Sequence, residues 1–293
     1  MINKGFSHIG VFFLYLLSLL PFWFLYLIAD VIFVMIYYIV GYRKQVVQDN
    51  LRNAFPEKSE EERHLIQKKF FRYLADLMVE VIKGISISKK ELDKRMVPRD
   101  FDVVQGYLDQ GKSVIGATGH YGNWEWTGQA FCMLTDKTRI IVYKPITNKV
   151  FEDFFVNMRS RFGGTLVEMK NTMRKMIQFK KDLFISVLVA DQTPVKHEAH
   201  YFTNFLNQPT AVFLGIEKLA KLIDAPVVFC DIQRVKRGYY TYTFVPLVSE
   251  PKQTAEHEIT GLHVKYLEKM IRQRPEYWLW SHRRWKFKPE DKS

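Results

Sequence analysis

The residues best suited to chemistry in this sequence lie at 119–126, which read Gly-His-Tyr-Gly-Asn-Trp-Glu-Trp. They follow an apolar run at 113–117 and open a stretch with helical character, so we expect a strand, a tight turn and the start of a helix. The carboxyl ends of strands in open α/β sheets are where sites form. If the carboxylate of Glu125 accepts the Nδ1 proton of His120, Nε2 can withdraw a proton from a hydroxyl group. The segment therefore predicts a pair that activates an alcohol.

The spacing of five residues is weak evidence for this pair, because His263 and Glu268 have the same spacing. Those two lie in a predicted regular helix, where five residues turn about 500° and leave the side chains about 140° apart. His120 instead lies in a turn between Gly119 and Gly122, whose backbones adopt unusual angles readily, so the carboxylate can fold back. On spacing alone, a helix-capping histidine and a glutamate in a surface ion pair are the more common arrangement.

A covalent acyl-enzyme has no obvious nucleophile in this chain. There is no G-x-S-x-G sequence, and neither Cys132 nor Cys230 follows a Gly-rich turn, which favours direct attack by an activated acceptor. The two cysteines also lack the spacing of a disulfide framework or a zinc module, which favours a reducing, cytosol-facing body. The sequence at 197–200, His-Glu-Ala-His, is not H-E-x-x-H, and we interpret it as a polar loop. We predict no metal and no cofactor.

The elements that must position these residues follow an alternating pattern. Apolar strand-like runs at 113–117, 139–143, 165–168 and 183–190 alternate with helical stretches, which predicts an α/β fold with a mainly parallel central sheet flanked by helices. The runs at 226–233 and 239–246 predict an antiparallel hairpin. Helices are expected after a capping box at Ser59, at 210–222, and before Pro275. No repeat or long linker appears, so residues 45–293 are predicted to form one α/β domain.

The amino-terminal segment is the sharpest compositional break. Residues 11–40 are almost wholly apolar, which as helix is about 45 Å against a hydrocarbon core of about 30 Å. Pro21 can kink the segment, and Asp30 would cost about 2.5–3.5 kcal/mol at mid-membrane. A tilted span and a bent, partly interfacial hairpin therefore both remain open.

The sequence after this segment indicates its orientation. Three basic residues follow, which places the body in the cytoplasm by the positive-inside rule: Arg43, Lys44 and Arg52. A signal peptide is disfavoured, because the apolar stretch is too long and ends without a small-residue cleavage site. We therefore predict a membrane anchor at residues 1–44, while the mean hydropathy of −0.15 excludes a protein made mainly of membrane spans.

The charge balance favours anionic partners. The chain carries 43 Lys and Arg against 31 Asp and Glu, a net +12, which suits membrane surfaces, phosphorylated lipids, acidic proteins or nucleic acid. Near the carboxyl end basic and aromatic residues interleave: Trp280, Arg283, Arg284, Trp285, Lys286, Phe287 and Lys288. This composition suits phosphate binding at headgroup level, and it also suits RNA. The apolar segment and the lack of a nucleic-acid module argue against nucleic acid.

The string at 119–126 resembles the H-x4-D/E motif of the glycerolipid acyltransferase superfamily. In its Glu form it resembles the lipid A biosynthesis acyltransferase family, the late lauroyl and myristoyl transferases. Four further stretches are similar to family landmarks, in family order, at 50–56, 190–192, 205–211 and 275–286. The likeness therefore covers nearly the whole chain.

The resemblance implies an acyl carrier protein thioester as donor, a phosphorylated glucosamine lipid as acceptor, and His120 and Glu125 as base and partner. It also implies an inner-membrane enzyme whose catalytic domain faces the cytoplasm. The sequence departs from the family at Thr193-Pro194 and at Asn207-Gln208. These departures leave the acceptor open among lipid A precursors and other bacterial lipids, with acyl carrier protein or acyl-CoA as donor.

Further residues are candidate substrate contacts. The motif adds Gly119, Asn123 and Trp124, and the basic carboxyl-terminal stretch adds Arg283 and Arg284.

Two other pairs have a functional and a structural interpretation. Arg159 and Arg161 suit a guanidinium near the thioester oxygen or an acceptor phosphate. A solvated helix face is the alternative, and the family's functional arginine in this region favours Arg161. Asp191 and Gln192 end a predicted strand on the same side as His120, where they suit either orienting the acceptor or capping the next segment.

The sequence thus predicts a membrane-associated O-acyltransferase, with three rival classes. A lipid hydrolase would admit water in place of the acceptor. A lipid-binding protein would tolerate loss of His120. A nucleic-acid-binding membrane protein would show strongly salt-dependent affinity for RNA or DNA.

Overall fold

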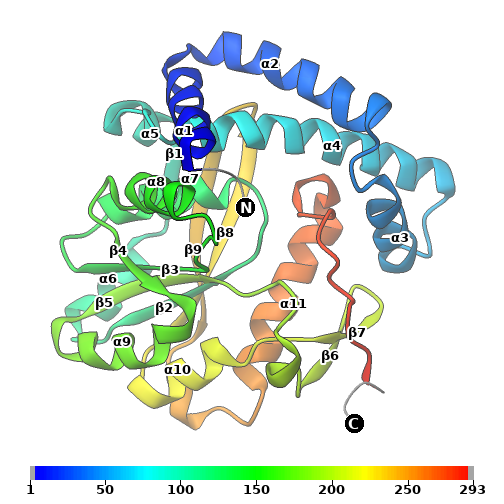
Figure 1. Cartoon of the computed structure of the whole chain (residues 1–293). Coiled ribbons are helices and arrows are strands. Elements are labelled where there is room, and N and C mark those ends of the chain that lie inside the picture. Colours follow the sequence, from blue (N-terminus) through cyan, green and yellow to red (C-terminus); the bar gives the residue numbers. More distant parts are fainter. Residues whose placement is uncertain (1–3, 290–293) are drawn as a thin grey trace.

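A seven-stranded sheet forms the centre of the molecule in a computed structural model that describes residues 4–289 (Figure 1). The strand order is β1-β9-β8-β2-β5-β3-β4. Neighbours are parallel except β8 and β9, which pair as an antiparallel hairpin. The strands are β1 (Met96–Arg99), β2 (Val114–Thr118), β3 (Thr138–Tyr143), β4 (Thr165–Glu168), β5 (Phe184–Val189), β8 (Val227–Lys236) and β9 (Tyr239–Val248). The predicted mainly parallel sheet is confirmed.

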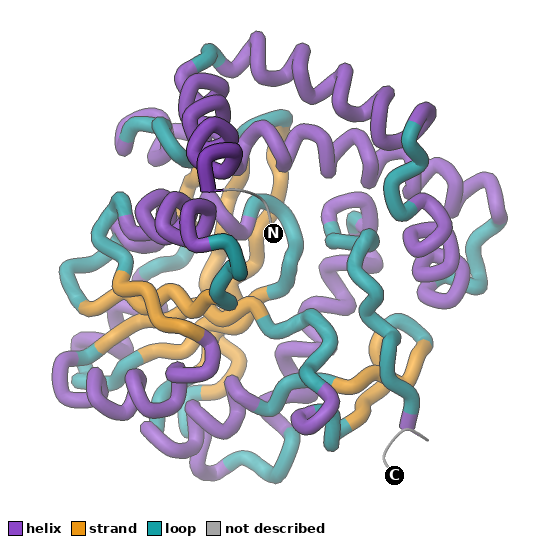
Figure 2. Tube along the Cα trace, viewed as in Figure 1, coloured by secondary structure: helices purple, strands orange, loops and turns teal. Residues whose placement is uncertain are grey.

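Helices cover the sheet, as Figure 2 shows. Two hydrophobic clusters lie among them, one with residues of α4, α10 and α11, the other with residues of α5, α6 and α7. The helices are α1 (Lys4–Leu19), α2 (Phe22–Val34), α3 (Lys44–Ala54), α4 (Glu60–Lys83), α5 (Lys89–Arg95), α6 (Asp102–Asp109), α7 (Trp124–Ala130), α8 (Lys149–Ser160), α9 (Thr172–Phe179), α10 (Gly215–Ile223) and α11 (Glu258–Gln273). The predicted capping box is present, since Ser59 and Glu62 each accept from the other's backbone N–H at the start of α4.

The predicted helix at 210–222 is wrong at its start. Residues 208–211 form β7 (Gln208–Ala211), which pairs with β6 (Phe202–Phe205) in a small antiparallel hairpin. Leu206 and Asn207 both have positive φ, 50° and 62°, as a two-residue hairpin turn requires. α10 begins only at Gly215. The turn chemistry therefore outweighs the helical character of the residues that follow.

The apolar amino-terminal segment forms two helices. α1 ends at Leu19, α2 begins after Pro21, and α2 continues into a π-helical turn at Met35–Ile39. Residues Phe22–Ile39 are long and apolar enough to cross a membrane, by length and composition only. Pro21, which can kink the segment, lies at the break between the two helices. Figure 1 shows α2 running alongside the long helix α4, so the apolar segment lies against the body of the protein.

Candidate functional site

His120 and Asp191 meet at the carboxyl ends of two adjacent parallel strands. In the register of β2 and β5, Thr118 pairs with Val189, so the residues two positions beyond each strand lie side by side. Nδ1 of His120 is 2.6 Å from Oδ1 of Asp191, and the backbone N–H of His120 donates to Oδ2 at 2.8 Å. The carboxylate thus holds both the ring and the backbone of the histidine.

The carboxylate of Asp191 is ionised and fixes the tautomer of His120. Its side chain is 3% exposed, and Nε1 of Trp278 donates to Oδ2 at 2.7 Å. Burial opposes the charge, but the imidazole and these hydrogen bonds outweigh it and lower the pKa of Asp191 to about 2. Nδ1 therefore carries the proton donated to Asp191, and Nε2 is the unprotonated nitrogen with a lone pair. The His120 side chain is 19% exposed.

Glycines permit this close approach. A Cβ on Gly119 would lie 2.8 Å from the Leu267 side chain and 3.0 Å from Oδ2 of Asp191, so only glycine lets the carboxylate reach the histidine backbone. Gly122 has φ +58°, and a Cβ there would lie 2.6 Å from Ile232. Gly119 is buried, and its part in the site is steric rather than a substrate contact.

Glu125 has a different partner from the one expected. Its two carboxylate oxygens accept from Nε and Nη2 of Arg159 at 3.0 and 2.6 Å, and both side chains are four-fifths buried. The contact predicted between Glu125 and Nδ1 of His120 is thus made by Asp191. The reason is topological, because the carboxylate arrives from the neighbouring strand rather than by a fold within the turn. Burial alone would lower the pKa of Arg159, but Glu125 raises it, so the Arg159 guanidinium is charged.

The structure also reverses the preference for Arg161. The Arg161 guanidinium donates to the carbonyls of Gly84 and Ile87 beyond the end of α4, at 2.8 and 3.1 Å. It therefore stabilises a helix terminus. Arg159, on the last turn of α8, is the arginine that the fold brings to the segment at 119–126, through Glu125.

Two motif residues predicted to contact substrate differ in their surroundings. Asn123 is fully buried, caps α7 by accepting from Trp126 N–H at 2.9 Å, and donates to Glu80 at 2.8 Å. Both the oxygen and the nitrogen of its amide are thus engaged within the protein, which gives Asn123 a structural role at the start of α7. Trp124 is half-buried, and its ring centroid lies 5.0 Å from that of His120 in an edge arrangement. It remains positioned to contact a substrate beside the imidazole.

Three residues complete the surroundings of His120. The amide of Gln192 donates to Nε2 at 3.0 Å, as expected for a residue at this strand end. The carbonyl of His120 accepts from the N–H of Leu279 at 3.1 Å. Trp278 had no role in our sequence interpretation. In the sequence, only its place in the stretch at 275–286 pointed to a role in the site. No local pattern connects it to Asp191, which lies 87 residues earlier.

The two candidate arginines near the carboxyl end lie in opposite environments. Arg284 is 2% exposed and donates to the carbonyl of Ala211 at 2.7 Å, and its Nε and Nη1 have no hydrogen-bond partner among the described residues. It lines a small interior cavity with Asp191 and His263. Burial lowers the pKa of Arg284 to about 10, so it remains a cation at neutral pH and balances the Asp191 charge. The structure thus places Arg284 in the interior, where it is a countercharge to Asp191.

Arg283 is exposed and lines a groove with a volume of about 740 Å³. The groove lies between α3, the β6–β7 hairpin and the carboxyl-terminal segment. Amide, basic and aromatic side chains line it: Gln45, Asn50, Asn53, Gln208, Arg283, Trp285, Lys286, Phe287 and Lys288. Thr193, which follows Gln192, donates to the carbonyls of Arg283 and Arg284 at 3.1 and 2.7 Å. This contact joins the groove to the segment that contacts His120.

Both cysteines are poor nucleophiles. Burial raises the pKa of Cys132 to about 12 and raises that of Cys230 as well, so neither is a thiolate at neutral pH. Within residues 4–289, no group of three or more His, Cys, Asp or Glu side chains is arranged to hold a metal ion. His120 is therefore the group best placed to activate a reactant.

Comparison with known proteins places this geometry in a family. Residues 1–287 match the model described as bacterial lipid A biosynthesis acyltransferase. The chain is 23% identical to a lipid A biosynthesis acyltransferase of Haemophilus influenzae, over 93% of this chain and 85% of the relative. It is also 24% identical to the lipid A biosynthesis palmitoleoyltransferase of Escherichia coli, over 86% of this chain and 81% of the relative. The identity to the lipid A biosynthesis lauroyltransferase of Escherichia coli is again 24%, over 85% of this chain and 80% of the relative.

Proposed function

Because the chain belongs to the bacterial lipid A biosynthesis acyltransferase family, we propose that it moves a fatty acyl chain from an acyl carrier protein thioester to a hydroxyl of a lipid A precursor or similar phosphorylated glycolipid. Membership makes the chain an acyltransferase. The observation that carries the proposed chemistry is the 2.6 Å contact between His120 and Asp191, which leaves Nε2 as a base. Donor, acceptor and membrane location are parts of the proposal.

In the proposed mechanism the acceptor hydroxyl reaches Nε2 of His120, and the Gln192 amide gives way to it. Its O–H bond breaks as the proton moves to Nε2, while the oxygen attacks the thioester carbonyl carbon. The tetrahedral intermediate expels the thiolate as the C–S bond breaks, and the imidazolium returns the proton to sulfur. Asp191 stabilises the imidazolium in between. The products are the acylated lipid and the free carrier thiol.

We assign Arg159 to the negative charge of the reaction. Its guanidinium is fixed by the two hydrogen bonds that it donates to Glu125, which lies five residues after the base. A fixed cation of this kind stabilises the oxyanion of the tetrahedral intermediate or an acceptor phosphate. Glu125 then acts as a positioning residue through Arg159.

The groove lined by Arg283 is the proposed site of the acceptor headgroup. Amide side chains hydrogen-bond sugar hydroxyls, aromatic faces cover sugar rings, and basic side chains suit phosphate. Its volume of about 740 Å³ accommodates a phosphorylated disaccharide. The contact of Thr193 with Arg283, one residue after the Gln192 that contacts His120, supports a headgroup site close to the proposed base.

Charge and topology support the rest of the proposal. A chain of net charge +12 attracts an acidic carrier protein and anionic membrane. Residues 1–44 are the proposed membrane-contacting part and 45–293 the catalytic domain, at the cytoplasmic face of the inner membrane. No nucleic acid enters this scheme.

Mass spectrometry of total lipids from cells with and without the gene tests the proposal. We expect the deletion strain to accumulate a lipid A species lacking one acyl chain, with restoration by the gene and not by a His120→Ala copy. A change confined to phospholipids, amino lipids or ornithine lipids would refute the lipid A acceptor. Release of free fatty acid by purified enzyme without acceptor, at the rate of transfer, would indicate a hydrolase instead.

A further inference from the structure

The first two helices present a continuous apolar surface to the outside. More than half of the exposed large hydrophobic side chains in the described part of the chain lie within residues 6–42. On α2 the exposed fractions are 66% for Trp23, 54% for Leu27 and 63% for Val31. We call the outward side chains of α1, α2 and the π-helical turn the outer face. A monomer in water does not tolerate so large a patch, so something covers it.

The opposite side of α2 belongs to the core of the protein. Leu25, Ala29, Phe33 and Tyr37 recur every four residues and are at most 5% exposed. They belong to the same hydrophobic cluster as residues of α4, which include Phe70. α2 is therefore a surface helix that is apolar on two sides, one facing the protein and one facing outward.

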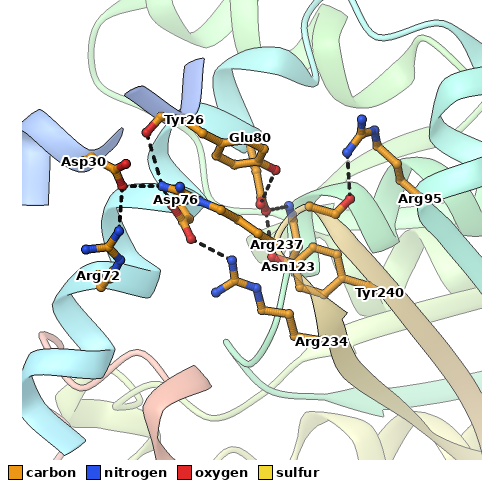
Figure 3. Close-up of polar contacts among 11 residues, drawn as sticks. Tyr26, Asp30, Arg72, Asp76, Glu80, Arg95, Asn123, Arg234, Arg237 and Tyr240 are labelled. Carbon is orange, nitrogen blue, oxygen red and sulfur yellow. Dashed lines mark hydrogen bonds and ion pairs between the residues drawn. The ribbon is translucent and has the colours of Figure 1, made fainter. Parts of the chain in front are cut away.

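An ion-pair network fixes α2 on the body, as Figure 3 shows. Asp30 of α2 accepts from Arg237 at 2.7 Å and from Arg72 at 3.1 Å. Arg237 also binds Asp76 of α4, so the arginine joins the two helices and the β8–β9 turn. Tyr26 donates to the buried carboxylate of Glu80 at 3.0 Å.

The first helix is held in the same way. The Lys83 ammonium donates to the carbonyls of Ser18 and Leu20, at 2.8 and 2.9 Å, where α1 ends. Ser86 donates to the same Ser18 carbonyl at 2.6 Å, and Asn148 donates to the Ser7 hydroxyl at 2.8 Å. Both helices and the bend between them are thus tied to the body at several points.

From these contacts we propose that α1 and α2 lie flat in the surface layer of a lipid bilayer, with the outer face in the lipid, and do not span it. To span, α2 would have to leave α4, abandon its buried side and carry an unpaired Asp30 into hydrocarbon. Lying flat keeps every one of these contacts and still removes the outer face from water.

Cations at the border of the apolar segment support a bilayer as the occupant. Lys68 lies 6.0 Å from the ring centroid of Tyr38 and Arg43 lies 5.7 Å from that of Tyr42, and both tyrosines are exposed. Basic residues beside an apolar, aromatic face are the pattern of helices that bind anionic membrane surfaces. The choice of a bilayer also rests on the proposed function, whose acceptor is a membrane lipid.

The depth of position 31 tests the proposal, because Val31 lies near the middle of Phe22–Ile39 and would be deep in the bilayer if this segment spanned it. Full-length protein with Trp23→Phe and Val31→Trp is bound to phosphatidylethanolamine–phosphatidylglycerol vesicles that carry bromine at a shallow or a deep acyl position, and the Trp23→Phe variant supplies the background. We expect the fluorescence added by Val31→Trp to be quenched more by the shallow lipid. Stronger quenching by the deep lipid would show an inserted helix or hairpin, and no quenching by either would show that no bilayer covers this face. Both results would overturn the proposal.

Topology in cells gives a second, independent readout. A split fluorescent-protein tag at the amino terminus, with its complement in the cytoplasm, is expected to fluoresce as brightly as the same tag at the carboxyl terminus. Fluorescence from the carboxyl-terminal tag alone would mean that the segment spans the membrane.

Matched variants separate this inference from the enzymatic proposal. Leu27→Glu with Val31→Glu is expected to lower vesicle binding at least tenfold, while Leu222→Glu, which is 50% exposed on α10, leaves it unchanged. The double variant is expected to retain transfer to acceptor dispersed in detergent and to lose transfer to acceptor in vesicles. Equal binding by the double variant and the Leu222→Glu control would refute the membrane role of the outer face. If the native protein binds vesicles but shows no acyl transfer, only the enzymatic proposal is refuted.

Discussion

His120→Ala is expected to lower kcat for acyl transfer by about 10²–10⁴-fold, the usual contribution of a general base. Nε2 is the one site atom that combines exposure to the acceptor with a lone pair fixed by its partner, because Asp191 holds the Nδ1 proton. KM for both substrates should change little, since the imidazole contributes to the transition state more than to binding. Steady-state kinetics with purified enzyme and a detergent-dispersed acceptor give both constants.

His120→Gln and His200→Ala control this experiment. Removing the imidazole leaves the Asp191 carboxylate buried without its main partner, which can destabilise the fold. The amide of His120→Gln can still donate to Asp191, so this variant should unfold near the wild-type temperature and remain inactive. His200 lies in an exposed loop and should be replaceable without loss. Turnover by His120→Gln within tenfold of wild type would remove the histidine from the mechanism.

The strand framework of this site was predictable because parallel strands carry a strong local signal. Four buried runs alternating with helices predicted β2, β3, β4 and β5, and each is present within two residues of its expected bounds. Placing His120 and Asp191 on the same edge of the sheet followed from that pattern. The hairpin β8–β9 followed equally from two runs around Arg237-Gly238.

The partners within the site were not predictable from local spacing. Which carboxylate reaches Nδ1 depends on the register of β2 against β5, a contact between residues 71 positions apart. The other differences between the predicted and the observed site concern burial. Asn123 is a fully buried helix cap, and Arg284 is an interior cation, although the neighbouring Arg283 is exposed. A sequence shows that a residue is polar, but the tertiary structure determines whether it faces substrate or interior.

The proposed headgroup groove and the outer face occur next to each other along the chain. The π-helical turn ends at Ile39, Gly41 turns the chain with φ +65°, and α3 then forms one wall of the groove. Asn50 of α3 donates to the carbonyls of Trp280 and His282, at 2.8 and 3.0 Å, which fixes that wall to the carboxyl-terminal segment. With α2 in the bilayer surface, a lipid headgroup could therefore enter the groove without leaving the membrane.

Asp191→Asn is expected to lower kcat on the order of 10²–10⁴-fold, although Asp191 need not touch either substrate. The amide cannot stabilise the imidazolium as a carboxylate does, and it can donate to Nδ1, which would place the proton on Nε2 and remove the base. KM should stay near the wild-type value, and a fall in kcat with unchanged KM marks a residue that acts through His120. The exposed Asp153→Asn is the matched control, since its ion pair with Lys149 is in solvent and is expected to contribute little.

The pH dependence of stability separates this role from a general loss of folding. Asp191 has a folded-state pKa of about 2, below the ordinary 3.8, so its charge stabilises the fold fully above about pH 5, and that contribution is lost as the pH falls through 2. The shift corresponds to about 2 kcal/mol. Wild type should therefore exceed Asp191→Asn in free energy of unfolding by about that amount at pH 7 and by about half of it at pH 3. Denaturant titrations at the two pH values measure the difference. A gap that stays constant or widens in acid would mean that Asp191 is neutral in the folded protein, and His120 would then lack the anion on which its role as a base depends.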